Sequence, residues 1–297
     1  MEDNKDNILG RKVFFVNPAY SIKKDIIPAL HRQEFEVYII DSYRDIKNLM
    51  KINQGSVLFL NVDTQLSVGS WFNYIRTFER DEFLSSISLS VITERMKQQD
   101  IDVFVKNTHL KGGIIDISEG GEEVLKRILG VLDSVNAKGM RQYVRANVDS
   151  DKEASLFWNY NGKMHHLKML DISSVGMAVS VPAALAEQIV AKNFLLQDVT
   201  MRLGVKQIPI DAVIYAIKKT ESGYIWVLLL LPSASSQAKN EIRSYVAETN
   251  QTELMLSINN LRQDDTDYNL LNYYNLATKH KLNTTISPFA SLPGHNA

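Results

Sequence analysis

The sequence predicts two domains, a doubly wound α/β domain followed by a six-stranded β-barrel with helices after it. Three observations support this prediction. The chain has 297 residues, which suits two domains of ordinary size. Apolar strand-like runs alternate with helical patterns as far as Leu132, and short strand-like runs separated by turn signals follow. The composition between the two regions is polar and rich in small residues, as in a linker.

In the first half, strands are expected at 12–17, 35–41, 56–63, 87–93 and 112–118. Amphipathic helices are expected at 21–33, 43–52, 67–83 and 122–136, with a weak element at 101–105. Strands that are apolar throughout indicate a parallel sheet covered on both faces. The alternation therefore favours a doubly wound arrangement.

The second half contains six strand-like runs, at 146–158, 163–170, 176–181, 199–203, 209–218 and 224–231. A short helical pattern at 183–192 interrupts them, and the pattern after Pro232 is helical again. Six short strands with intervening turns predict a small closed or nearly closed barrel. We therefore divide the chain into an α/β domain (10–133), a linker and ligand-binding segment (134–145), a barrel with its helix (146–262), and an extra helix with a disordered tail (263–297).

Composition narrows the function classes. Lys and Arg number 33 against 34 Asp and Glu, so no overall charge attracts nucleic acid or an anionic membrane. There is no cysteine, and the adjacent pair His165-His166 lies on a predicted strand, where neighbours point to opposite faces, so no metal site is expected. The start is polar and acidic, unlike a signal peptide, and the apolar run 224–231 is too short to span a bilayer. We expect a cytoplasmic protein without membrane insertion.

Two short motifs flank a predicted hairpin. The first is Arg141-Gln-Tyr-Val-Arg145, and the second is Asp171-Ile-Ser-Ser-Val-Gly176. Asn161-Gly162 lies between the strand-like runs that separate them, and both residue types tolerate the positive φ of a tight hairpin turn. The hairpin is expected to bring the two motifs to the same edge of the barrel.

This arrangement resembles the PilZ domain, a β-barrel family that binds the bacterial second messenger cyclic di-GMP through an Arg-x-x-x-Arg segment and a later Asp/Asn-x-Ser-x-x-Gly. The resemblance covers about residues 138–250 and implies a six-stranded barrel followed by a helix. It also implies that Arg141 and Arg145 grip phosphate and base, that Asp171 and Ser173 bond to guanine, and that Gly176 lets the chain approach closely. Arginine suits this role because its planar fork pairs with phosphate or guanine.

The first half resembles a receiver domain in the order and length of its elements. Receivers hold Mg²⁺ with acidic residues after the first strand, but Asn17 and Pro18 stand there. The phosphoacceptor position is closest to Asn61, with Asp63 two residues on, and Ser118 lies where a lysine is expected. We therefore predict a receiver-like domain that lacks the phosphorylation residues, because Mg²⁺ requires oxygen ligands such as carboxylates.

The sequence carries none of the common catalytic motifs that we sought, so we predict that the protein is not an enzyme and needs no cofactor. The predicted function is a cyclic di-GMP receptor that relays binding to a protein partner through domain rearrangement, with the partner on the N-terminal domain. The family suggests a role such as motility. One alternative is a protein–protein adaptor with a ligand-free barrel, and a second is a phosphorelay regulator, which the missing acidic residues disfavour.

Overall fold

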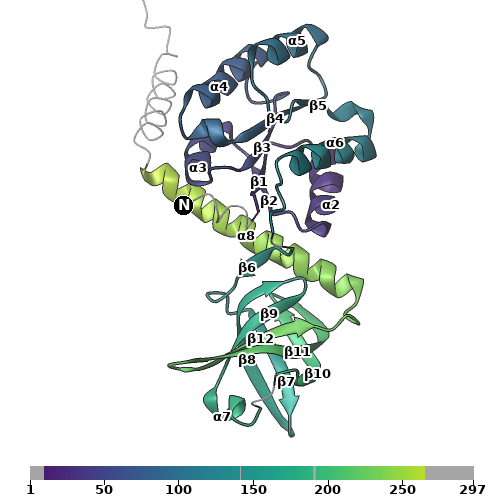
Figure 1. The fold of residues 1–297 in the computed structure, drawn as a ribbon, viewed down its shortest axis with the longest axis vertical. Coiled ribbons are helices and arrows are strands. Elements are labelled where there is room, and N and C mark those ends of the chain that lie inside the picture. Colours follow the sequence, from purple (N-terminus) through teal and green to yellow (C-terminus); the bar gives the residue numbers. More distant parts are fainter. Residues whose placement is uncertain (1–9, 141, 190–191, 265–297) are drawn as a thin grey trace, which may run out of the picture. The chain divides into compact units, whose positions relative to one another are not determined.

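The structure is a computed structural model that describes residues 10–140, 142–189 and 192–264. The chain forms two compact units, Met1–Leu254 and Met255–Ala297, and the second is described as far as Asp264. From residue 265 onward, the predicted extra helix and tail lie outside the described residues. The first unit contains an α/β domain, a barrel and most of the helix that follows the barrel (Figure 1).

The α/β domain is built on a five-stranded parallel sheet with the order β2-β1-β3-β4-β5. The strands are β1 (Val13–Val16), β2 (Val37–Ile40), β3 (Val57–Asn61), β4 (Ser88–Thr93) and β5 (Ile114–Asp116). This order is that of flavodoxin-like folds, so the doubly wound prediction is confirmed. The relationship to receivers stays a prediction.

Helices cover both faces of this sheet. One face packs against the π-helical turn η1 (Ile22–Ile26), α2 (Ile27–Arg32) and α6 (Gly121–Ser134) in a single buried cluster. The other helical elements are η2 (Tyr43–Asp45), α3 (Ile46–Ile52), α4 (Val68–Arg80), η3 (Leu84–Ser86), α5 (Gln98–Asn107) and the 3-10 turn η4 (Ile117–Glu119). Figure 1 shows α3, α4 and α5 on the side of the sheet away from α2 and α6.

Local sequence explains these helices. In α4 the buried residues Trp71, Ile75 and Phe78 recur at helical spacing, and the Ser67 hydroxyl caps the first turn by accepting from the Ser70 amide at 3.2 Å. The weak element expected at 101–105 is part of α5. Its periodicity is faint because Phe104 is its only buried residue.

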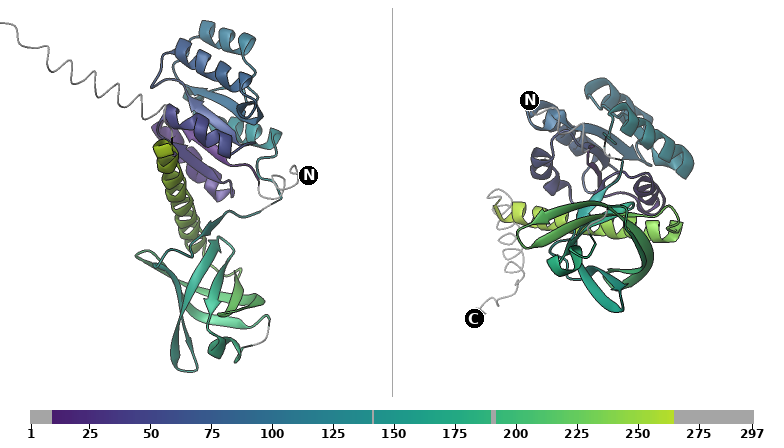
Figure 2. Two further views of the ribbon diagram at one scale, coloured as in Figure 1. Left: turned by 90° about the vertical axis from the view of Figure 1, so that its left-hand side faces the viewer. Right: turned by 60° about the horizontal axis from the view of Figure 1, so that its bottom comes forward.

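The barrel has the strands β7 (Ala154–Tyr160), β8 (Lys163–Ser173), β9 (Gly176–Val181), β10 (Leu195–Leu203), β11 (Lys206–Thr220) and β12 (Gly223–Leu230). These six strands are antiparallel, and pairing between β8 and β9 closes them into a barrel (Figure 2). The short helix α7 (Ala183–Ala186) follows β9. The predicted six-stranded barrel is therefore confirmed.

The first expected strand of the barrel is in fact two strands. The run 146–158 divides into β6 (Arg145–Asn147) and β7, separated by the polar turn 149–153. β6 pairs with the far end of β8, on the same side of β8 as β7, while β9 pairs with the opposite side. The hairpin of β7 and β8 turns at Asn161-Gly162, whose φ angles of 51° and 76° are both positive, as predicted.

The helix α8 (Ser236–Asp264) follows the barrel and contacts both domains. Ile242 and Val246 belong to the same buried cluster as Trp226 in the barrel. On the α/β side, the Gln251 amide forms two hydrogen bonds of 2.9 Å with the backbone N–H and C=O of Ile39 in the edge strand β2. No helix among the described residues is long and apolar enough to cross a bilayer.

Candidate ligand-binding site

The two predicted motifs meet where β6 pairs with β8. Arg145 stands opposite Ser173, and Asn147 stands opposite Asp171. The sequence prediction that the hairpin brings the motifs to the same edge agrees with this pairing. β6 continues the first arm of the hairpin beyond the turn 149–153, on the same side of β8 as β7.

Alternation along these strands places the polar residues on the outside of the barrel. Ala146 and Ile172, which face each other, both lie in the barrel core. Their neighbours in the strands point the other way, so Arg145, Asn147 and Asp171 are on the outer face. Arg145 is exposed and lies diagonally across from Asp171, within reach of a long side chain.

Ser173 and Gly176 lie at the turn between β8 and β9 and are both buried. The Ser173 hydroxyl donates to the Gly176 carbonyl at 3.0 Å. A Cβ at position 176 would lie 2.3 Å from the Leu228 carbonyl oxygen, so the close approach that requires glycine is to β12. In this structure both residues hold the turn that follows Asp171, and a direct contact with guanine stays a prediction.

Arg141, the first residue of the motif, lies outside the described residues. The segment before it is anchored on the α/β domain, because the buried Ala137 accepts a hydrogen bond of 2.7 Å from the Arg11 amide. The Lys138 ammonium lies 6.0 Å from the centre of the Phe35 ring. Asn136 and Gly139 both have positive φ, 49° and 61°.

A groove of about 810 Å³ borders Arg145 and Asn147. Its opposite side comes from the α/β domain, and its charged lining residues are Arg11, Lys12, Glu36, Lys51, Arg145 and Glu253. Asn147 and the cations of the α/β domain were not predicted from the sequence as residues of this site. Asn147 could have been found from strand alternation, because it is two residues beyond Arg145. The cations come from distant parts of the sequence and carry no local signal.

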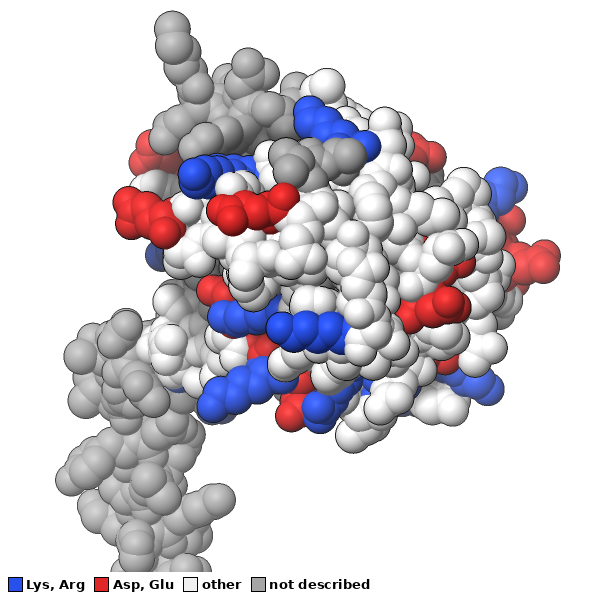
Figure 3. All heavy atoms as spheres, turned by 90° about the horizontal axis from the view of Figure 1, so that it is seen from below, with Lys and Arg blue, Asp and Glu red and all other residues white. Residues whose placement is uncertain are grey.

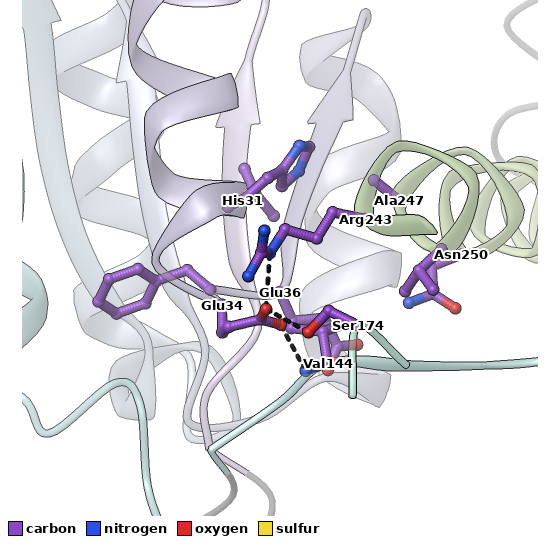
Figure 4. A pocket seen from close by; sticks show the side chains of 11 residues that line it. His31, Glu34, Glu36, Val144, Ser174, Arg243, Ala247 and Asn250 are labelled. Carbon is purple, nitrogen blue, oxygen red and sulfur yellow. Dashed lines mark hydrogen bonds and ion pairs between the residues drawn. The ribbon is translucent and has the colours of Figure 1, made fainter. Parts of the chain in front are cut away.

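A smaller pocket, of about 20 Å³, lies beside this site and is lined by His31, Glu34, Val144, Ser174 and Arg243, among others (Figure 4). The Glu34 carboxylate accepts from the Ser174 hydroxyl at 2.6 Å, from Arg243 Nε at 2.7 Å and from the Val144 amide at 3.2 Å. Burial lowers the pKa of His31 below its ordinary value, which keeps the imidazole neutral beside these charges at neutral pH.

At the end of the parallel sheet where a receiver has its acidic site, Asn17, Asn61 and Thr93 surround a single carboxylate, that of Asp63. The Asn61 amide donates to the Asn17 carbonyl at 2.9 Å. Asp63 accepts from the Thr93 hydroxyl at 2.6 Å and from the Glu94 amide at 2.7 Å, so each carboxylate oxygen already has a donor. Within the described residues, no group of three or more His, Asp or Glu side chains could hold a metal ion.

We expect the α/β domain to gain no phosphoryl group when the protein is incubated with acetyl phosphate and Mg²⁺. Asp63 is engaged by two donors, and Asn17 and Asn61 supply no carboxylate for the metal. Intact-mass measurement checks this, with a known receiver domain treated in parallel as the positive control. A stoichiometric adduct at Asp63 would contradict the prediction.

Charge is mixed on the face of the molecule seen from below. Figure 3 shows blue and red side chains interspersed with uncharged residues there. This agrees with the balanced composition, whose formal net charge is −1. The face seen in Figure 3 therefore has no extended surface of one charge.

Comparison with known proteins gives structural neighbours only. No family model matches the sequence, and no curated protein matches it. Among solved structures, the PilZ domain of YcgR from Escherichia coli with c-di-GMP matches with a TM-score of 0.33 and 12% identity, over 39% of this chain and 96% of that one. The barrel region is similar to PilZ domains.

Two longer neighbours match over about half of their own length. Bacillus subtilis inhibitor of motility (MotI) has a TM-score of 0.31 and 19% identity, over 36% of this chain and 50% of that one. The MrkH–c-di-GMP complex of K. pneumonia has a TM-score of 0.31 and 18% identity, over 40% of this chain and 54% of that one.

Proposed function

We propose that the protein is a cyclic di-GMP receptor without catalytic activity that acts in the cytoplasm. The observation that carries the proposal is the pairing of β6 with the end of β8. It places Arg145 of the first motif diagonally across from Asp171 of the second, on the outer face of the barrel. An Arg-x-x-x-Arg segment and an Asp-x-Ser-x-x-Gly turn must lie this close together if both are to contact one ligand.

The chemistry of the two residues suits different parts of the ligand. The Arg145 guanidinium can pair with a phosphate or with the O6 and N7 acceptors of guanine, and its flat face can stack on the base. The Asp171 carboxylate can accept hydrogen bonds from the N–H groups of guanine. Arg141 is proposed to complete the grip on the phosphates, while Ser173 and Gly176 support Asp171 by fixing the turn.

We further propose that binding is relayed through the segment between the domains to a protein partner on the α/β domain. Ala137 is fixed on the α/β domain and Arg145 is fixed in the barrel sheet. When the arginines bind the ligand, the segment between Ala137 and Arg145 must change its conformation. The free energy available to shift the domains is limited by the difference between the ligand's affinities for their ligand-free and ligand-bound arrangements.

Calorimetric titration of the full chain with cyclic di-GMP tests the proposal, with GTP as the control ligand. We expect saturable heat for cyclic di-GMP only, together with a changed small-angle scattering profile. Added protection from hydrogen exchange is expected in peptides covering residues 138–145. An absence of heat would favour the ligand-free adaptor. Binding with superimposable scattering curves and unchanged exchange would overturn the relay while leaving the receptor intact.

A further inference from the structure

We infer that Glu34 of the α/β domain is a positioning residue for the cyclic di-GMP site, an inference that rests on the proposed function. Its carboxylate holds the segment that carries Arg145 and the turn that follows Asp171 in a shape that is ready for ligand. Glu34 lies at neither motif and does not itself line the groove beside Arg145. It acts through Val144 and Ser174.

The contacts of Glu34 tie together three separate parts of the chain. Oε2 accepts from the Val144 amide, one residue before Arg145. Oε1 accepts from the Ser174 hydroxyl, inside the second motif, and from Arg243 Nε on α8 (Figure 4). The Glu34 side chain is only 8% exposed and that of Arg243 is 22% exposed, so these bonds are largely shielded from water. Charge-assisted bonds in such surroundings are among the stronger ones in proteins.

The backbone of Glu34 is held in a conformation that glutamate rarely adopts. Its φ is 63°, in the left-handed region that favours glycine, directly after the C-terminus of α2. The end of α2 supplies this constraint locally, because the Glu34 amide donates to the His31 carbonyl at 3.0 Å and the Phe35 amide donates to the Leu30 carbonyl at 3.1 Å, as in a Schellman motif. This backbone turn directs the Glu34 side chain away from the helix, where its carboxylate meets the three donors.

The arrangement leaves the site open. With the bonds of Glu34 in place, Arg145 is exposed and borders the groove, and Asn250 Nδ2 on α8 donates to the Arg145 carbonyl at 3.1 Å. The backbone at Val144 and Arg145 is thus held by hydrogen bonds while the Arg145 side chain is exposed. A segment that is ordered in advance loses less entropy on binding, so its ligand is bound more tightly.

Glu34→Gln tests this selectively. A carboxylate offers only acceptors to its three donors, whereas an amide has one acceptor oxygen and one NH₂ group. Whichever way the amide is turned, the NH₂ faces at least one N–H donor, from Val144 or from Arg243. Glu122→Gln is the matched control, because it removes the same charge from an exposed position in the first turn of α6 that lines neither the groove nor the smaller pocket.

We expect Glu34→Gln to weaken cyclic di-GMP binding to the full chain by about tenfold, from the added cost of ordering the segment on binding. Peptides covering residues 142–148 should exchange faster without ligand, and Glu122→Gln should match wild type in both measurements. Ser174→Ala, which removes one donor and keeps the glutamate, should weaken binding in the same direction by a smaller factor. Urea unfolding midpoints show that each variant is folded.

The outcomes separate the two proposals. Equal or tighter binding by Glu34→Gln, with wild type binding normally, overturns the role of Glu34 and leaves the receptor function standing. Loss of binding with unchanged exchange at 142–148 also overturns it, because the variant then acts by some route other than ordering this segment. No binding by wild type overturns the receptor function, and the role of Glu34 with it.

Discussion

Replacing Arg145 by alanine is expected to lower the affinity for cyclic di-GMP by about ten- to a hundredfold. A hydrogen bond to a charged group is worth about 1.5–3 kcal/mol, and each 1.4 kcal/mol or so is a factor of ten in affinity. Arg145 is exposed on the outer face of the barrel, so its removal leaves no cavity in the core. Calorimetric titration of the full-length variant measures the change.

Two further substitutions make the result specific. Arg145→Lys keeps the charge but loses the planar fork, so it should recover only part of the affinity. Lys163→Ala removes an exposed cation from the opposite end of β8 and should bind as wild type does. Unchanged affinity in Arg145→Ala, or an equal loss in Lys163→Ala, would argue against a site at the β6–β8 pair. Arg141→Ala should behave as Arg145→Ala does.

Replacing Gly176 by alanine is expected to lower the free energy of unfolding by about 3 kcal/mol, as overpacking of a well-filled site does. The added Cβ would lie 2.3 Å from the Leu228 carbonyl oxygen and 3.1 Å from Leu229 Cδ2. Gly176 is paired with Leu229 between β9 and β12, so the backbone cannot move away without disturbing the ladder. Urea denaturation monitored by tryptophan fluorescence measures the loss.

Gly130→Ala is the matched control for that substitution. Gly130 lies on the exposed side of α6, and a Cβ there would meet no atom within 4 Å. Alanine is favoured over glycine in a helix by about 1 kcal/mol, so this variant should be slightly more stable than wild type. If both variants change stability alike, the clash at Gly176 is not what requires glycine there.

The fold was largely predictable because the buried strands carry strong local patterns. Val57–Asn61 and Ser88–Thr93 are buried throughout, and such runs between amphipathic helices specify a parallel sheet. The start of β10 was missed because its polar Asp198 lies at a bulge with a positive φ of 53°, which interrupts the alternation. The split between β6 and β7 was missed because apolar residues continue on both sides of a polar turn.

The candidate site was predictable only in part. Arg145 and Asp171 could be named because the spacing of each motif is local, and the structure places them near each other. Glu34 could not be named, because its partners are 110, 140 and 209 residues away in the sequence. A glutamate after a helix gives no sign of such bonds, because its positive φ belongs to the local end of α2.

The two hydrogen bonds between Gln251 and Ile39 cover part of an edge of the parallel sheet. β2 is an edge strand of the parallel sheet, and an uncovered edge offers unpaired N–H and C=O groups on which a strand from another molecule can add. The Gln251 amide occupies one such N–H and C=O pair, as a neighbouring strand would. A ligand-driven movement that withdrew α8 from this edge would uncover a surface for strand addition, so self-association on ligand addition would report that movement directly.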